Sequence, residues 1–134
     1  MSIPPTHHRF AVLRHEGVPS PHFDFLVDVD GVSPLATWRS NAWPIVAPLT
    51  LLRRPDHRRI YLDYEGPISG NRGQVTRVDA GECRLVQLSV DHWQLAMPGA
   101  LMLDLRRLDA DRWQACPDSA DLNNSGDVSK RERI

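Results

Sequence analysis

The chain has 134 residues and a formal net charge of −1, and its length suits one ordinary domain. Hydrophobic residues make up 41% and charged residues 25%, which excludes an intrinsically disordered chain. No apolar run approaches the roughly 18 residues that a membrane-spanning helix needs, and we expect no signal peptide at the start. Two cysteines, Cys83 and Cys116, are too few for a disulfide framework, so we expect reduced thiols in a cytoplasmic protein.

The basic residues are almost all arginine, because Lys130 is the only lysine among 16 basic side chains. Arginine forks match phosphate oxygens in a bidentate way, which suits a protein that handles phosphate. A GC-rich genome would produce the same bias, so composition leaves the function open. The net charge near zero excludes a general polyanion binder.

Alternating polar and apolar residues predict short strands, and 11 prolines and 8 glycines interrupt any helical period. After a first strand that ends at His15, the expected strands are 22–29, 35–38, 59–64, 75–78, 83–90, 92–97, 101–108 and 113–116. Turns are expected at Asp30-Gly31, 79–81, Pro98-Gly99 and 109–111. We therefore predict an all-β fold, a small antiparallel β-barrel of about eight strands, because closure removes exposed strand edges.

The last part of the chain differs in composition, since residues 118–134 contain no aromatic residue and few apolar ones. We therefore expect the barrel domain to cover residues 1–117 and the rest to form a polar tail. The tail contains an EF-hand-like spacing of oxygen ligands, but its flanking segments are too short for the two helices of that motif. Ca²⁺ is thus a secondary expectation beside a plain polar tail. Its ligands would be Asp121, Asn123, Ser125 and Glu132.

The segment His22-Phe23-Asp24 is the sharpest chemical pattern. Residues two apart in a strand point to the same face, so His22 and Asp24 lie side by side while Phe23 faces the core. His15 ends the preceding strand, and the loop after it can return the chain beside that residue. Two imidazoles and a carboxylate form a facial metal site suited to Mn, Fe or Zn. A solvated strand face would show the same spacing, so both interpretations stay open.

His57 and Tyr61 form a second pattern, four residues apart in a predicted strand and therefore on one face. Beside a metal, this pair would hold a phosphate and assist proton transfer. An ordinary polar hairpin rim is the alternative.

In this order and spacing, the segments resemble the 3′-phosphoesterase domain of bacterial DNA ligase D and its stand-alone relatives. The similarity covers about residues 9–82 and lies in His15, His22-Phe23-Asp24-Phe25, Asp30-Gly31-Val32 and the segment from Asp56-His57 to Glu65-Gly66. It implies a small β-barrel that uses Mn²⁺ to remove a 3′-phosphate or a 3′-terminal ribonucleoside in DNA repair. It also implies nucleic-acid 3′ ends as substrate and a DNA ligase or polymerase of end joining as partner, with no membrane.

The resemblance also implies roles for individual residues. The metal ligands would be His15, His22 and Asp24. The phosphate-facing catalytic pair would be His57 and Tyr61.

The chain departs from that family where the phosphate is gripped. The family arginine two residues after the metal-binding aspartate is Leu26 here, and the glutamate before the Asp-His pair is Pro55. Two alternatives to the phosphoesterase therefore remain: a binding module that has lost turnover, and a non-haem iron oxygenase, which uses the same ligand types. The arginines available to replace the lost charge are Arg14, Arg39, Arg59 and Arg72.

Overall fold

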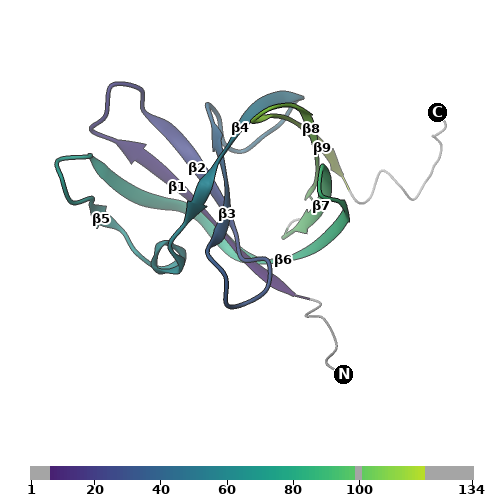
Figure 1. The fold of residues 1–134 in the computed structure, drawn as a ribbon, viewed down its shortest axis with the longest axis horizontal. Coiled ribbons are helices and arrows are strands. Elements are labelled where there is room, and N and C mark those ends of the chain that lie inside the picture. Colours follow the sequence, from purple (N-terminus) through teal and green to yellow (C-terminus); the bar gives the residue numbers. More distant parts are fainter. Residues whose placement is uncertain (1–6, 99–100, 120–134) are drawn as a thin grey trace.

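The structure is a computed structural model that describes residues 7–98 and 101–119, and strands make up 63% of it (Figure 1). The strands are β1 (His8–Glu16), β2 (His22–Val27), β3 (Leu35–Ser40), β4 (Leu49–His57), β5 (Gly66–Pro67), β6 (Gln74–Ser89), β7 (His92–Met97), β8 (Leu101–Asp109) and β9 (Arg112–Ser119). A short 3-10 helix, η1 (Arg59–Leu62), lies between β4 and β5. Within the described residues, no helix has the length and apolar character needed to cross a membrane.

Eight of these strands form a closed antiparallel barrel. Their hydrogen-bonded order is β1-β2-β3-β4-β9-β8-β7-β6, and pairing of β6 with β1 completes the ring. The short β5 is an additional strand that pairs with β6. The predicted all-β barrel is therefore confirmed. Within the described residues, closure gives each of the eight barrel strands a hydrogen-bonded neighbour on both sides.

Alternation along the strands produces two apolar layers. The barrel interior contains Phe10 and Val12 of β1, Phe25 of β2, and a cluster of tryptophans from other strands. Some outward side chains of β1, β2 and β3 are also apolar, and η1 and the start of β6 pack against them. This outer apolar layer consists of Ala11, Leu13, Leu26, Leu35, Leu62 and Val75. The next outward residues, at the end of β1 and the start of β2, therefore lie beside this outer apolar layer.

The segment 59–64 was predicted as a strand, and this prediction is wrong. The backbone N–H of Tyr61 donates to the carbonyl of Arg58 (3.1 Å), and that of Tyr64 donates to Ile60 (3.0 Å). Leu62 is buried against the outer layer, whereas Ile60 is 54% exposed. Local hydrogen bonds thus satisfy the backbone here while a single apolar side chain anchors the turn.

Two further differences concern β4 and β6. The sequence pattern did not predict β4, although it pairs with both β3 and β9. The turn expected at 79–81 is also wrong, because β6 is one strand from Gln74 to Ser89. Its register with β1 shifts between Val12 and Leu13, so Val78 has no partner in β1. Such a bulge bends a strand without ending it.

β9 extends to Ser119, two residues past the predicted boundary at Pro117. The domain division at this point stays a prediction. The EF-hand-like pattern, with Asp121, Asn123, Ser125 and Glu132, lies outside the described residues.

Candidate metal centre and its pocket

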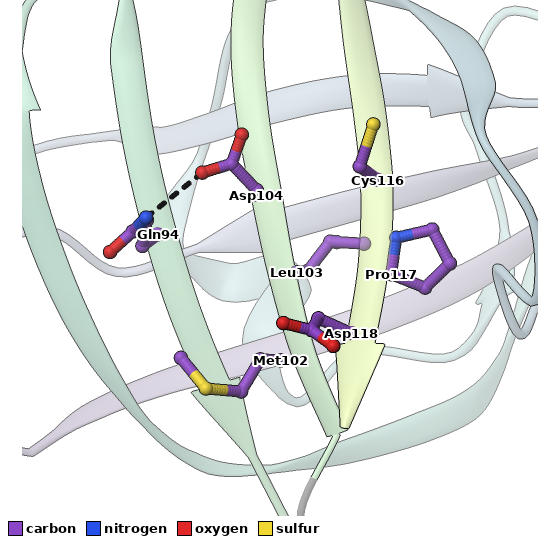
Figure 2. A pocket seen from close by; sticks show the side chains of 7 residues that line it. All are labelled: Gln94, Met102, Leu103, Asp104, Cys116, Pro117 and Asp118. Atoms are coloured by element: carbon purple, nitrogen blue, oxygen red, sulfur yellow. Dashed lines mark hydrogen bonds between the residues drawn. The ribbon is translucent and has the colours of Figure 1, made fainter. Parts of the chain in front are cut away.

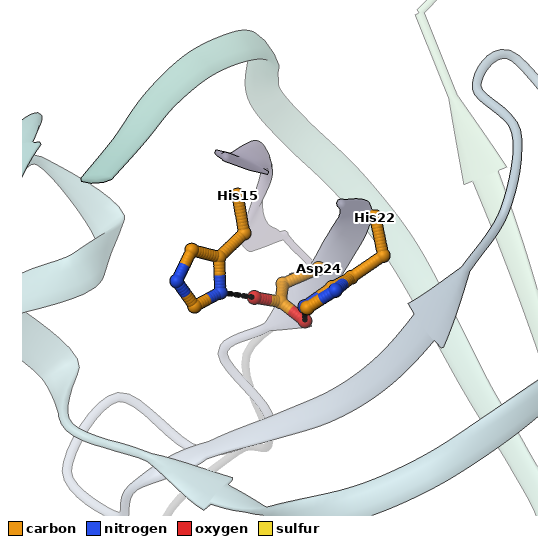
Figure 3. A group of neighbouring side chains, drawn as sticks. All are labelled: His15, His22 and Asp24. Carbon is orange, nitrogen blue, oxygen red and sulfur yellow. Dashed lines mark ion pairs between the residues drawn. The ribbon is translucent and has the colours of Figure 1, made fainter. Parts of the chain in front are cut away.

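His15, His22 and Asp24 come together where β1 ends and β2 begins (Figure 3). His15 and His22 are direct partners in the β1–β2 register. Asp24 Oδ1 lies 3.3 Å from His22 Nε2, and Asp24 Oδ2 lies 3.8 Å from His15 Nδ1. His22 and Asp24 are buried, while His15 is partly exposed toward a cavity. The strand spacing therefore produces the cluster that the sequence predicted.

Backbone carbonyls fix the orientation of both imidazoles. His15 Nε2 lies 2.8 Å from the carbonyl oxygen of Arg72, and His22 Nδ1 lies 2.8 Å from that of Ser20. A carbonyl oxygen only accepts hydrogen bonds, so the hydrogen-bond network assigns the ring proton to these nitrogens. The opposite nitrogens, His15 Nδ1 and His22 Nε2, therefore direct lone pairs at Asp24. Metal-binding histidines in proteins are typically held in this way.

His57 follows the same rule from the end of β4. Its Nδ1 lies 3.1 Å from the carbonyl oxygen of Pro55, and its Nε2 lies 4.0 Å from Asp24 Oδ2. A third imidazole lone pair thus points toward the same carboxylate. With neutral imidazoles, the centre directs acceptor atoms of His15, His22, His57 and Asp24 at one point.

This set of acceptors fits a divalent cation. Among the described residues, the buried His22 Nε2 has no hydrogen-bond partner. A buried unsatisfied acceptor costs about 1–3 kcal/mol, and a cation would remove that cost. The ligand atoms of His15, His22 and Asp24 lie within 4.8 Å of one another. Neighbouring ligands of one ion at about 2.0–2.2 Å lie about 3–3.6 Å apart, so the more widely separated ligand atoms would move together by about an ångström when an ion binds.

Two glycines allow the loop before β6 to reach His15. Gly73 has φ +80°, and a Cβ at this position would lie 2.1 Å from the carbonyl oxygen of Glu16. Gly17 has φ +76°, and its Cβ would lie 3.0 Å from Gly73 Cα. The two backbones therefore approach closely only because both side chains are absent. This contact brings the Arg72 carbonyl within hydrogen-bond distance of His15.

A cavity of about 410 Å³ opens beside the centre. His15, Asp24, His57 and Tyr61 line it, so the structure places the second predicted pair beside the first. The rings of His57 and Tyr61 lie 5.9 Å apart between centroids. Their proximity results from the turn into η1 rather than from a shared strand face. The remaining lining residues are Leu13, Asp56, Arg58, Ile68, Ser69, Arg72 and Val75.

Two of the predicted phosphate-binding arginines have other partners. Arg59 donates to both carboxylate oxygens of Asp28, at 2.6 and 2.8 Å, and this hydrogen bonding lowers the pKa of Asp28. Arg14 pairs with Glu16 at 2.8 Å and lies over the ring of Phe23. Neither arginine lines the cavity.

The other two predicted arginines lie nearer the centre. Arg72 lines the cavity, and its Nε donates to the carbonyl of Ser69 at 2.7 Å. Arg39 is the direct register partner of Asp24 on β3, although no ion pair joins them. Its Nε is buried and has no hydrogen-bond partner among the described residues.

Arg58 is a cavity residue that the sequence analysis missed. As a strand residue next to His57, it would point away from that side chain. The chain instead turns into η1 after Arg58, whose guanidinium lies 5.9 Å from the centroid of the Tyr61 ring. Its position in the sequence between the two candidate catalytic residues was the feature that could have predicted it.

A second cavity, of about 290 Å³, lies on β7, β8 and β9 (Figure 2). Asp104 accepts hydrogen bonds there from His92 Nε2 (2.7 Å), Gln94 Nε2 (3.0 Å) and Arg106 Nε (2.9 Å). Burial acts to raise the pKa of Asp104, but these donors outweigh it and the net pKa is lowered. Its carboxylate is thus well supplied with donors, unlike that of Asp24.

Two comparisons with known proteins gave no match to this chain. No model of a known protein family matches the sequence, and no curated protein matches it.

Proposed function

We propose that this protein is a Mn²⁺-dependent phosphoesterase that removes a 3′-phosphate or a 3′-terminal ribonucleoside from nucleic-acid 3′ ends in DNA repair. The observation that carries the proposal is the convergence of imidazole lone pairs on Asp24 at the wall of a cavity. A volume of about 410 Å³ is within the usual range for small-ligand sites and would admit a terminal nucleotide. The sequence resemblance supports the choice of metal and substrate.

The residues divide into a metal-holding group and a phosphate-facing group. His15, His22 and Asp24 would hold the ion, with open coordination positions toward the cavity. Mn²⁺ there would polarise the phosphoryl oxygen and lower the pKa of a bound water. His57 presents its Nε2 lone pair to the cavity, so it can accept a proton or, once protonated, donate to a phosphate oxygen. Tyr61 supplies a hydroxyl donor in the same cavity.

A non-catalytic metal- or nucleic-acid-binding barrel is the second candidate, and one observation favours it. Leu26, which replaces the family arginine, has 0% exposed surface and belongs to the outer apolar layer. No charge therefore reaches the phosphate from that position. Losing a phosphate-gripping charge typically costs a few kcal/mol of transition-state stabilisation, which would suffice to abolish useful turnover.

Incubation with defined primer-templates tests the proposal. The DNA should end in a 3′-phosphate or in one ribonucleotide, and each should be incubated with Mn²⁺ and with EDTA. Release of phosphate or of the nucleoside only with Mn²⁺ supports the phosphoesterase. His57→Gln should retain Mn²⁺ binding but slow turnover by roughly 10²–10⁴-fold, as expected for a lost proton-transfer group. Mn²⁺ binding without product would favour the binding module, and oxygen consumption with Fe²⁺ would favour an oxygenase.

A further inference from the structure

Most arginines in the described part of the chain bond to carboxylates or backbone carbonyls. Those with neither an ion pair nor a side-chain hydrogen bond are Arg39, Arg54, Arg58 and Arg84. The first three lie on β3, β4 and the residue after β4. Arg84 lies on β6, opposite Ala96 of β7. Three of these four arginines therefore come from neighbouring parts of the chain, β3, β4 and the turn after β4, on the side of the barrel that carries the metal centre.

The strand register places these arginines on the outer surface. Arg39 is opposite Asp24, and Arg54 is opposite Thr37. The neighbour of Arg54, Arg53, lies over the ring of Trp38 at 4.8 Å, on the barrel-interior side, so Arg54 points outward. Residues two apart on facing strands are diagonal neighbours, which puts Arg39 and Arg54 side by side.

Arg58 connects this surface to the cavity. It lines the cavity beside His57 and is exposed. Asp56, an acidic residue of the same cavity wall, is paired with Arg53 at 3.2 Å and so does not compensate it. Arg39 adds a buried Nε without an acceptor, a group that a phosphate oxygen would satisfy.

We infer that Arg39, Arg54 and Arg58 form a binding track for the phosphodiester backbone of a nucleic-acid strand whose 3′ end enters the metal pocket. The inference rests on the proposed function and specifies which side chains hold the strand behind its 3′ end. Neighbouring strands lie about 4.8 Å apart, so β4 is about 10 Å from β2. With one phosphate for each guanidinium, the three arginines would contact about three nucleotides next to the 3′ end.

Fluorescence anisotropy of a labelled, 3′-phosphorylated 12-nucleotide DNA tests the track, with the full chain in EDTA so that turnover is prevented. Arg54→Gln and Arg58→Gln should each weaken binding roughly tenfold, because each removes a charged hydrogen bond. Each should also reduce the slope of log K against log salt concentration by about 0.7, the value for one phosphate contact on a single strand. Arg84→Gln is the matched control, because it removes the same charge from an arginine whose side chain has no ion pair or hydrogen bond to another described residue, and it should change neither quantity.

Arg39 requires a second variant because part of its side chain is buried. Arg39→Lys retains the charge and should keep the salt slope, whereas Arg39→Gln should lower it. Melting curves of both variants identify any loss of folding. If both Arg39 variants unfold, the binding affinities and salt slopes of Arg54→Gln and Arg58→Gln alone test the track.

Three results would overturn the track. The first is an equal effect of Arg84→Gln, which would reveal only general charge attraction. The second is competition by a mononucleoside 3′-phosphate as strong as that by the 12-nucleotide DNA. The third is equally tight binding of a poly-glutamate peptide of similar charge.

The outcome for the track is independent of the outcome for catalysis. A protein that binds DNA through these arginines but produces no product with Mn²⁺ keeps the track and loses the phosphoesterase. Equal hydrolysis of mononucleotide and 12-nucleotide substrates, with no effect of the arginine variants on binding, keeps the phosphoesterase and removes the track.

Discussion

Replacing Asp24 with asparagine should stabilise the metal-free protein and at the same time abolish metal binding. Asp24 Oδ1 lies 3.3 Å from His22 Nε2, so two acceptors oppose each other in a buried position when His22 is neutral. An asparagine amide at this place would donate an N–H to the ring nitrogen that lacks a partner. Because an unsatisfied buried acceptor costs about 1–3 kcal/mol, we expect a gain of about 1–2 kcal/mol in the free energy of unfolding. For a domain of this size, the melting temperature should rise by roughly 3–8 °C.

The response to metal should have the opposite sign. Mn²⁺ at about 100 times its Kd stabilises a protein by about 2.7 kcal/mol through binding to the folded state alone. The wild type should show this gain, whereas Asp24→Asn should show almost none, since two remaining histidines hold a divalent ion poorly. Thermal unfolding in EDTA and in Mn²⁺ therefore measures both effects in one set of curves.

Asp28→Asn is the matched control. Asp28 lies on the same outward row, four residues further along, and is also buried. It receives two hydrogen bonds from Arg59, at 2.6 and 2.8 Å, so its substitution should destabilise the protein by about 1–3 kcal/mol. If Asp24→Asn destabilises as much as Asp28→Asn, Asp24 is an ordinary structural carboxylate and our reasoning about opposed acceptors fails. An undiminished Mn²⁺ response in the Asp24→Asn variant would place the ion elsewhere.

Three further predictions follow from burial and pairing. Leu26→Arg would bury a charge where no surface is exposed, so its urea midpoint should fall by an amount equivalent to about 3 kcal/mol or more; an unchanged midpoint would contradict this. Burial raises the pKa of Cys83 to about 11, so a thiol reagent at pH 8 should label only Cys116 rapidly, and two fast thiols would argue against it. The hydrogen bond from Arg59 lowers the pKa of Asp28 below its ordinary 3.8, so the pair stabilises the fold above that pH and loses its effect as pH falls further. The stability deficit of Arg59→Gln, measured by urea unfolding, should therefore shrink steadily below pH 3.8, and a constant deficit would indicate a packing role.

Period-two alternation was sufficient to predict most of the barrel but not β4. In β2, the apolar residues Phe23, Phe25 and Val27 all face the interior, so the sequence pattern and the structure agree. β4 instead uses Arg53 as an interior-facing residue, with its guanidinium over the rings of Trp38 and Trp93. In a pattern that sorts residues only into apolar and polar, a long polar side chain that covers aromatic rings is indistinguishable from a surface residue. Only the tertiary structure shows what it covers.

The candidate site likewise combines features set by local strand geometry with contacts between residues far apart in the sequence. His22 and Asp24 could be predicted because their relation depends only on strand geometry. The partner of Arg59, by contrast, is Asp28, 31 residues away, and no local pattern connects them. Arg59 therefore looked as available for phosphate as Arg58, which does line the cavity.

Two pairs of histidine and aspartate in this barrel show why hydrogen bonding, rather than residue identity, distinguishes a metal centre. His92 Nε2 lies 2.7 Å from Asp104, and further donors complete that carboxylate, so the group is stable as it stands. His22 Nε2 lies 3.3 Å from Asp24 with its proton held on the opposite nitrogen by a backbone carbonyl. Carbonyls hold the protons of His15 and His57 in the same way. Because rigid backbone groups impose these tautomers, the centre keeps its lone pairs directed at one point, and a cation is the ligand that satisfies all of them together.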